Sequence, residues 1–367
     1  MSGRRARPLV VAAAVLAALG ALAYAWWPEA PVPAPSRPAS AYAAIDKIDV
    51  HVHVPMERAA EARRVFARHG VRLALNANGG DTAPGLLPYC HVDFARAEAP
   101  DFASYARDAL TRCRERGGVG LKIGKALGLG YRTSDGRLLA VDDPRLDVVF
   151  EVAGELSLPV LIHTGDPQAF FRPPTRDNER YDELSAHPSW SFWGPEWPSW
   201  EDLFAAYEAR VARHPGTRFV GAHFGNAPEE PERVGAMLAR YDNLYVETGA
   251  RIPELGRHDA ARMRALFVRW RRRILFGTDV QMGREGSWVL GSAGAQPDPP
   301  ARIPVFYETH WRYFETTDRR FAHPTPIQGD WRIDGLGLPR EVLVDLYHDN
   351  AARVFGLDDR EAAPGVE

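Results

Sequence analysis

The segment Ile45-Asp-Lys-Ile-Asp-Val-His-Val52 is followed, after a short break, by a longer helical stretch from Met56 to His69. The first segment is rich in the β-branched and apolar residues of a buried strand. Together the two segments predict one strand-helix unit, and the same alternation continues through the rest of the chain. Such alternation favours a parallel sheet with crossover helices.

The alternation predicts eight strands, and their expected cores are Ile45–Val52, Val71–Leu75, Leu87–Phe94, Val119–Ile123, Pro159–His163, Arg218–His223, Leu244–Glu247 and Arg273–Phe276. Helices are expected between them, among others at Phe102–Arg116, Pro144–Ser157, Trp200–His214 and Asp259–Trp270. A doubly wound sheet would show a Gly-rich phosphate loop after its first strand, which is missing here. The expected fold is therefore an α/β protein, a (β/α)₈ TIM barrel.

Two connections are longer than usual for such a barrel and rich in aromatic residues. Asp166–Ser199 follows the fifth strand and Val280–Gly337 follows the eighth. Long loops at the carboxyl ends of barrel strands lie on the catalytic face, so their aromatic rings can roof the active site. The alternative is that these rings only pack the insertions onto the barrel.

The N-terminus differs from this body. Residues 1–27 contain an uncharged run, Leu9–Trp27, behind three arginines, and they predict a signal peptide or a membrane anchor. Five prolines in residues 28–44 predict an extended linker. The barrel would then comprise residues 45–367 and be exported, either to the periplasm or on the outer side of a membrane.

Composition excludes several other classes of protein. The chain has 367 residues with a formal net charge of -3, so nucleic acid is not an expected partner. Its two cysteines, Cys90 and Cys113, cannot build a disulfide framework or a multi-cysteine metal site. We expect two buried thiols in preference to a disulfide, and any metal must be bound by histidines and carboxylates.

Polar residues gather at the predicted carboxyl ends of the strands. Asp49-Val-His-Val-His53 ends the first strand, and residues two apart in a strand point the same way, so His51 and His53 can bind one ion. His163, His223 and Asp279 end the fifth, sixth and eighth strands. In a barrel these five side chains converge on one point.

These motifs, DVHVH, LIHTGD, GAHFGN and FGTD, together with HDNAARVF near the C-terminus, resemble the amidohydrolase superfamily. The similarity is to the amidohydrolase-related branch that includes aminocarboxymuconate semialdehyde decarboxylase. It implies that His51, His53, His163 and Asp279 bind one divalent ion, usually zinc, and that His223 is a catalytic acid/base group. Asp279 would also take part in proton transfer.

Three further cationic residues are candidates for substrate binding. Lys122 lies on the fourth strand, where binuclear relatives carry a bridging lysine, so a second metal is a less favoured alternative. Arg251 follows the seventh strand, and Arg312 lies in the last long connection. Each arginine can bind an anion through its planar fork of donors or form a structural salt bridge instead.

The resemblance implies an enzyme that acts on a small molecule. The first expectation is a hydrolase that cleaves a C–N or C–O bond with zinc-activated water. The alternative is a nonoxidative decarboxylase of an unsaturated carboxylic acid, which requires an anion clamp beside the metal. A tethered, non-catalytic binding protein is the third possibility, and both a homodimer and membrane attachment through the uncleaved N-terminus remain open.

Overall fold

The computed structural model describes residues 44–165 and 167–357. Ten strands form one sheet in the order β10-β9-β1-β2-β3-β4-β5-β6-β7-β8, and neighbouring strands from β1 to β8 are parallel. The strands are β1 (Lys47–His53), β2 (Val71–Asn76), β3 (Leu86–Cys90), β4 (Gly120–Ile123), β5 (Val160–Ile162), β6 (Phe219–Gly221), β7 (Leu244–Glu247), β8 (Ile274–Leu275), β9 (Val280–Met282) and β10 (Trp288–Leu290). A separate pair contains β11 (Phe321–Ala322) and β12 (Arg332–Ile333).

The sheet closes into a barrel because its last strand is interrupted. β8 pairs with β7, the chain then leaves the ladder at Phe276, and β9 pairs in parallel with β1. The backbone N–H of Val50 donates to the carbonyl of Phe276 over 3.0 Å, which links β1 to the end of β8. The predicted (β/α)₈ barrel is thus confirmed, with all eight expected strands present.

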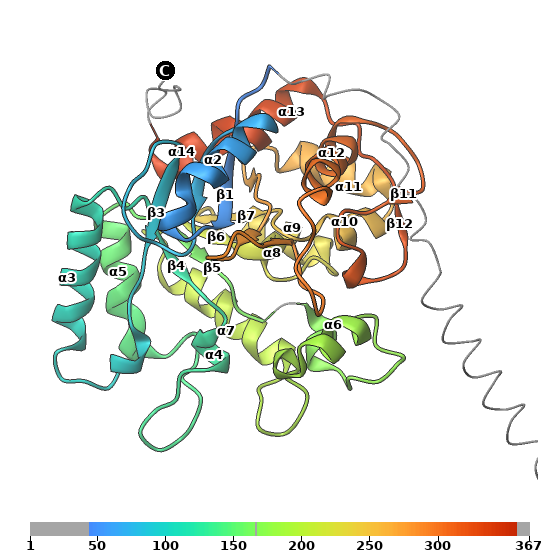
Figure 1. Ribbon diagram of the computed structural model, residues 1–367. Helices are drawn as coiled ribbons and strands as arrows, with labels where there is room; N and C mark the ends of the chain where they lie inside the picture. The colour runs from blue at the N-terminus through green and yellow to red at the C-terminus, as the bar shows by residue number, and fades with distance from the viewer. Residues whose placement is uncertain (1–43, 166, 358–367) are drawn as a thin grey trace, which may run out of the picture. The chain divides into compact units, whose positions relative to one another are not determined.

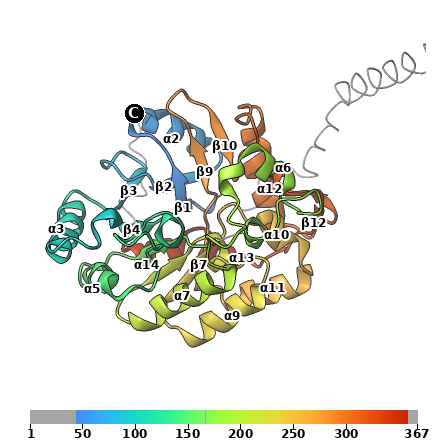
Figure 2. The ribbon, with the colours of Figure 1, turned by 90° about the horizontal axis from the view of Figure 1, so that it is seen from below.

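Helices surround the barrel (Figures 1 and 2). They are α2 (Ala59–Arg68), α3 (Phe102–Glu115), α4 (Ala126–Leu129), α5 (Asp147–Glu155), α6 (Tyr181–Ala186), α7 (Trp200–Arg213), α8 (Ala222–Gly225), α9 (Pro231–Arg240), α10 (Ile252–Arg257), α11 (Ala260–Arg269), α12 (Arg302–Glu315), α13 (Arg340–Val344) and α14 (Asn350–Phe355).

Local signals start some of these helices where the sequence predicts. Ser199 caps α7: its hydroxyl accepts from the N–H of Asp202 over 3.1 Å, and the Asp202 carboxylate accepts from the N–H of Ser199. Asp259 caps α11 through the N–H of Arg262 over 2.9 Å. A side-chain cap satisfies N–H groups that the first helical turn leaves without a partner.

Alternate residues of the strands pack into two hydrophobic clusters. Val160 and Ile162 of β5 belong to the larger cluster, which includes residues of the surrounding helices such as Phe150. Leu161 belongs to the smaller cluster, which collects barrel strands and α14. This period of two is that of strands with both faces buried, and it assigns Lys122, which pairs with Leu161, to the inner face.

Export or membrane attachment is not supported, and this expectation is wrong. In the part of the chain that the structure describes, no helix is long and apolar enough to cross a membrane. The longest described helices have 14 residues, whereas a span needs about 20. Leu9–Trp27 and the proline-rich linker before Ala44 lie outside the described residues.

The expectation of two free thiols is also wrong. Cys90, the last residue of β3, and Cys113 on α3 form a disulfide, with their Cα atoms 5.7 Å apart. That separation lies in the range a disulfide spans. α3 packs closely enough on the sheet to bring the two sulfur atoms together, which spacing along the sequence does not reveal.

Candidate active site

Residues at the carboxyl ends of β1 and β8 form a cluster of metal-binding groups. One ligand atom each of His51, His53 and Asp279 lies within 4.8 Å of the others. Asp279 Oδ1 is 3.5 Å from His51 Nε2 and 3.3 Å from His53 Nε2. Two imidazoles and a carboxylate are a donor set suited to a divalent transition metal. The residues present therefore fit a metal site.

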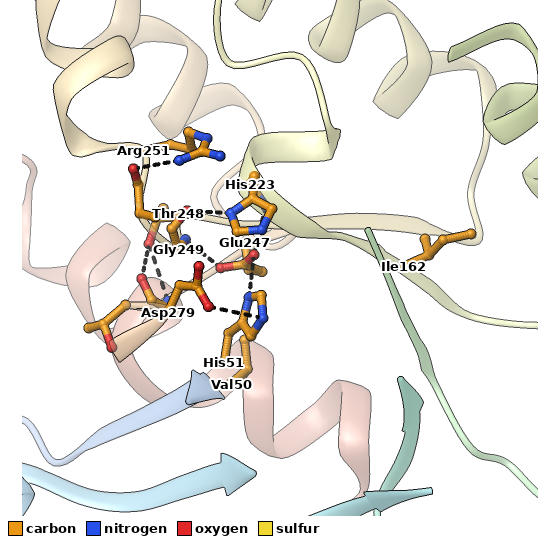
Figure 3. Close-up of polar contacts among 12 residues, drawn as sticks. Val50, His51, Ile162, His223, Glu247, Thr248, Gly249, Arg251 and Asp279 are labelled. Carbon is orange, nitrogen blue, oxygen red and sulfur yellow. Dashed lines mark hydrogen bonds and ion pairs between the residues drawn. The ribbon is translucent and has the colours of Figure 1, made fainter. Parts of the chain in front are cut away.

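Contacts behind these histidines orient both rings (Figure 3). Glu247 Oε1 accepts from Nδ1 of His51 over 3.2 Å, and Asn78 Oδ1 accepts from Nδ1 of His53 over 2.8 Å. With each Nδ1 engaged in this way, Nε2 carries the lone pair that faces Asp279. Outer hydrogen bonds of this type set the tautomer and the direction of a metal-binding histidine.

Glu247 is completely buried at the end of β7 and organises several neighbours at once. Its Oε1 also accepts from the backbone N–H of His223 over 2.7 Å, and its Oε2 accepts from the backbone N–H of Gly249. Burial raises the pKa of Glu247, while His223 and these hydrogen bonds oppose the rise. The carboxylate joins the ends of β1, β6 and β7 around the site.

Asp49 has a similar bracing position one layer deeper. Its carboxylate accepts from the N–H of His51 over 3.1 Å and from the hydroxyl of Thr278 over 2.5 Å. Burial raises the pKa of Asp49 to about 7, against the effect of these hydrogen bonds. Asp49 thereby connects β1 to the interrupted strand that presents Asp279.

Asp279 itself remains ionised at neutral pH. Burial alone would raise its pKa, but the neighbouring His51, His53 and His223 outweigh burial and hold it well below the usual range. An ionised carboxylate is the form that binds a cation. The electrostatics of the cluster therefore agree with its donor chemistry.

The backbone around the site is strained. Among the described residues, non-glycine residues with positive φ that follow β6, β7 and β8 are His223, Phe224, Asn226, Ala250 and Asp279. The left-handed conformation costs roughly 1–2 kcal/mol per residue. Hydrogen bonds hold it in place: the N–H of Asp279 donates to the carbonyl of His51 over 2.8 Å, and the N–H of Ala250 donates to that of Thr278 over 3.1 Å.

His163 and His223 lie beside the cluster. Their ring centroids are 4.2 Å apart, and the ring of His223 is 5.2 Å from that of His51. Nδ1 of His223 donates to the carbonyl of Gly249 over 2.9 Å. All five residues expected to converge, these two and the three of the cluster, line one cavity of about 350 Å³.

Cationic side chains line the same cavity. Lys122 Nζ lies 3.0 Å from Nε2 of His51, and the largely buried Arg251 donates from Nη1 to the carbonyl of Ala250 over 2.9 Å. Lys125, which the sequence pattern did not single out, is a third. Arg312 is placed elsewhere: it pairs with Asp318 over 2.8 Å and is not among the residues lining the cavity.

The two long connections contribute unequally to the cavity. Phe170 and Trp190, after β5, are part of its wall. Phe306, Tyr307, Tyr313 and Phe314 of α12 are instead buried in the hydrophobic core. The aromatic residues after β5 thus partly surround the site, whereas those of α12 pack the connection onto the barrel.

Polar contacts join these two connections over the cavity. Nε2 of His187 donates to the carbonyl of Gly294 over 3.0 Å, and the hydroxyl of Ser292 donates to Glu183. Glu183 also pairs with the buried Arg180 over 2.8 Å. Figure 2 shows α6 beside the β9–β10 hairpin, in agreement with these contacts.

Sequence reasoning missed the residues that act behind the first contacts. Glu247 was noted only as a salt-bridge partner for Arg251, and Asn78, Lys125 and Glu183 were not considered. Glu247 at a strand end was the one available signal, since a carboxylate there faces the same mouth as the histidines. The other three lie in loops or connections without a periodic pattern.

A closed barrel with histidines and an aspartate at its strand ends defines a class of metal-dependent enzymes, and comparison with known proteins identifies the family. The amidohydrolase family model matches residues 91–357, and the chain belongs to this family. Among curated protein sequences, none matches.

Solved structures share the fold at low sequence identity. A 2,6-dihydroxybenzoate decarboxylase from Rhizobium is 14% identical, with a TM-score of 0.50 over 85% of this chain and 99% of that one. An amidohydrolase-like protein from Staphylococcus aureus is 14% identical, with a TM-score of 0.51 over 85% and 100%. A Polaromonas dihydroxybenzoic acid decarboxylase with bound manganese and 2-nitroresorcinol is 13% identical, with a TM-score of 0.49 over 85% and 97%.

Proposed function

We propose that this protein is a metal-dependent nonoxidative decarboxylase of a small aromatic or otherwise unsaturated carboxylic acid. The observation that carries the proposal is the set of three cations, Lys122, Lys125 and Arg251, that lines the cavity with the metal-binding cluster. Arg251 presents a planar fork of donors that matches a carboxylate. This is the anion clamp that a decarboxylase needs.

His51, His53 and Asp279 would hold the metal, and His163 is the fourth ligand that the family resemblance implies. The ion would act as a Lewis acid that polarises an oxygen of the substrate. We leave the choice between zinc and another divalent ion to experiment. Lys122, beside Nε2 of His51, is assigned to substrate or charge balance in preference to bridging a second metal.

The chain's own residues supply the remaining chemistry. Arg251 binds the acid and orients it, since a buried charged donor fixes the position of a carboxylate. Because Nδ1 of His223 donates to Gly249, Nε2 is the atom that delivers a proton to the cavity. The C–C bond to the carboxylate breaks, CO₂ leaves, and the carbon that retains the electron pair takes this proton. Asp279, ionised, can accept a proton but is not the acid in this step.

Two considerations favour decarboxylation over the hydrolysis expected first. A hydrolase of a neutral amide or ester has no requirement for three cations around its reacting bond. The Rhizobium protein of the same fold is a decarboxylase of a hydroxylated benzoate, which names the class of acid to test first. A purely structural metal site would not explain the catalytic pattern of His223, Arg251 and Lys122.

The experiment is a substrate panel with the protein loaded with Mn²⁺ or Zn²⁺. Hydroxybenzoates, beginning with 2,6-dihydroxybenzoate, and open-chain unsaturated acids are compared with amides and lactones. We expect CO₂ release from at least one acid, and a His223→Asn variant should keep the metal but lose this activity. Hydrolysis of an amide or lactone without CO₂ release from any acid would refute the proposal.

A further inference from the structure

A second hollow lies beside the catalytic cavity. It is an aromatic groove of about 580 Å³, built by the connection after β5 and the start of α7, and its lining includes Phe171, Phe192, Trp193, Trp197 and Trp200. Trp193 is 55% exposed, whereas large hydrophobic side chains elsewhere in the described chain are mostly buried. An exposed indole at the edge of a preformed groove is typical of a binding surface.

The groove and the cavity share a wall. Lys125 lines the cavity, and its Nζ lies 5.2 Å from the ring centre of Phe170 and 5.7 Å from that of Phe192. Phe170 lines the cavity as well, whereas Phe192 lines the groove. The N–H of Phe192 donates to the carbonyl of Phe170 over 2.8 Å, so the two rings come from adjoining backbone segments. A ligand that passes Lys125 therefore moves from one hollow into the other.

The aromatic side chains of the groove support one another. Phe192 contacts Phe171 at 5.4 Å and meets Trp197 edge to face at 5.1 Å between ring centroids. Trp200 is held beneath them by Phe204 and by the guanidinium of Arg233. These contacts fix the groove before any ligand binds, which lowers the entropy that binding must overcome.

We propose that the groove is a specificity subsite for an aryl group of the substrate, with the carboxylate end of the same molecule in the catalytic cavity. The inference rests on the proposed function, because it uses the acid-binding cavity as its anchor. A volume of about 350 Å³ is at the small end for a ligand site, and the groove extends it with flat aromatic surface. The substrate is then a two-part molecule, an acidic ring followed by an aryl extension.

The test measures binding of three probes by calorimetry to the metal-loaded full chain: 2-hydroxybenzoate, 4-phenyl-2-hydroxybenzoate and 4-phenylphenol. We expect the phenyl group to tighten binding of the acid about tenfold, a gain typical of a stacked ring. Trp193→Ala should remove most of this gain and leave 2-hydroxybenzoate unchanged, and Trp193→Phe should restore part of it. Val268→Ala, an exposed apolar residue on α11, is the matched control and should change neither affinity.

The outcomes separate this inference from the proposed function. If neither acid binds the wild type but 4-phenylphenol binds in a Trp193-dependent way, the proposed function fails while the groove remains an aryl site. An equal gain from the phenyl group in the wild type and in Trp193→Ala overturns the subsite. Loss of a dimer in Trp193→Ala, seen by sedimentation with the gain unchanged, assigns the groove to a second copy of the chain and also overturns it.

Discussion

The strand ends and the roof over them are built in different ways. At the strand ends, His51 is 1% exposed and Glu247 is fully buried, and each is held by hydrogen bonds from neighbouring strands. In the roof, contacts such as Ser292 to Glu183 join separate loops, and Trp193 is 55% exposed. The contrast indicates that the chemistry is placed on the rigid barrel, whereas the choice of substrate is left to replaceable segments.

Removing both β1 histidines should have the largest effect. His51→Ala combined with His53→Ala deletes two of the three clustered ligands, so metal content should fall to background. Activity should drop about 10³-fold or more, because several kcal/mol of Lewis-acid stabilisation are lost. Metal analysis with kinetics measures both, and a variant that keeps one equivalent of metal would place the ion elsewhere.

His310 tests whether α12 behaves as core and not as roof. Burial lowers the pKa of His310 to about 4, so between pH 6.5 and 4 the unfolded chain binds a proton that the folded chain does not. The free energy of unfolding should therefore fall as the pH drops through this window, by roughly 3 kcal/mol if His310 acts alone.

His310→Phe should make this fall in stability smaller, as measured by denaturant unfolding at pH 7 and pH 4.5. His323 is buried and its pKa is likewise lowered to about 4. Adding His323→Phe should reduce the slope further. A slope unchanged in both variants would show that these residues are accessible to protons in the folded state, and it would move α12 from the core to the mobile roof.

Glu247→Gln probes the support behind the metal. The amide keeps the size of the side chain but loses the charge that orients His51, so metal affinity should fall about 10- to 100-fold. Competition with a chelator measures the change. The surface variant Glu155→Gln, whose partner is Arg107, is the control and should bind metal like the wild type.

Arg251→Ala and Arg312→Ala form a matched pair. Loss of a buried charged hydrogen bond to substrate should raise KM about 10- to 100-fold for Arg251→Ala. Arg312 pairs with Asp318 away from the cavity, so its variant should keep the wild-type KM. Equal effects of the two substitutions on KM would remove Arg251 from substrate binding.

The smallest effect is expected in the roof. Ser292→Ala removes the hydroxyl that donates to Glu183, and one such bond contributes about 1 kcal/mol. Amide exchange in residues 181–186 and 291–294 should become about fivefold faster, while exchange in β1 and β7 stays constant. Faster exchange in the strands as well would mean that roof and strand ends open together.

Local pattern predicts much of this molecule because each barrel strand is a short, buried run. β7 spans Leu244–Glu247 as predicted, and His51, His53, His163, His223 and Asp279 share one cavity as their places at strand ends imply. The third strand ends at Cys90, four residues before its predicted end, because Asp93 starts a short helical turn by capping the N–H of Ala95.

Contacts between distant segments could not be predicted in this way. The bond from His51 to Glu247 spans 196 residues, and periodicity reports only which side of an element is buried. The same holds for Cys90 and Cys113 and for the choice between Arg251 and Arg312. In each case the answer depends on how separate elements pack, which a single sequence does not encode in any local pattern.

The interruption between β8 and β9 has a consequence for folding. The bond from Val50 to Phe276 and the bond from Asp279 to His51 are neighbouring links between the first and last strands. Asp279 can therefore meet His51 and His53 only after the two ends of the barrel have joined. Any ion that prefers the assembled cluster stabilises the closed chain by mass action. Metal uptake during refolding would then report the moment at which the barrel closes.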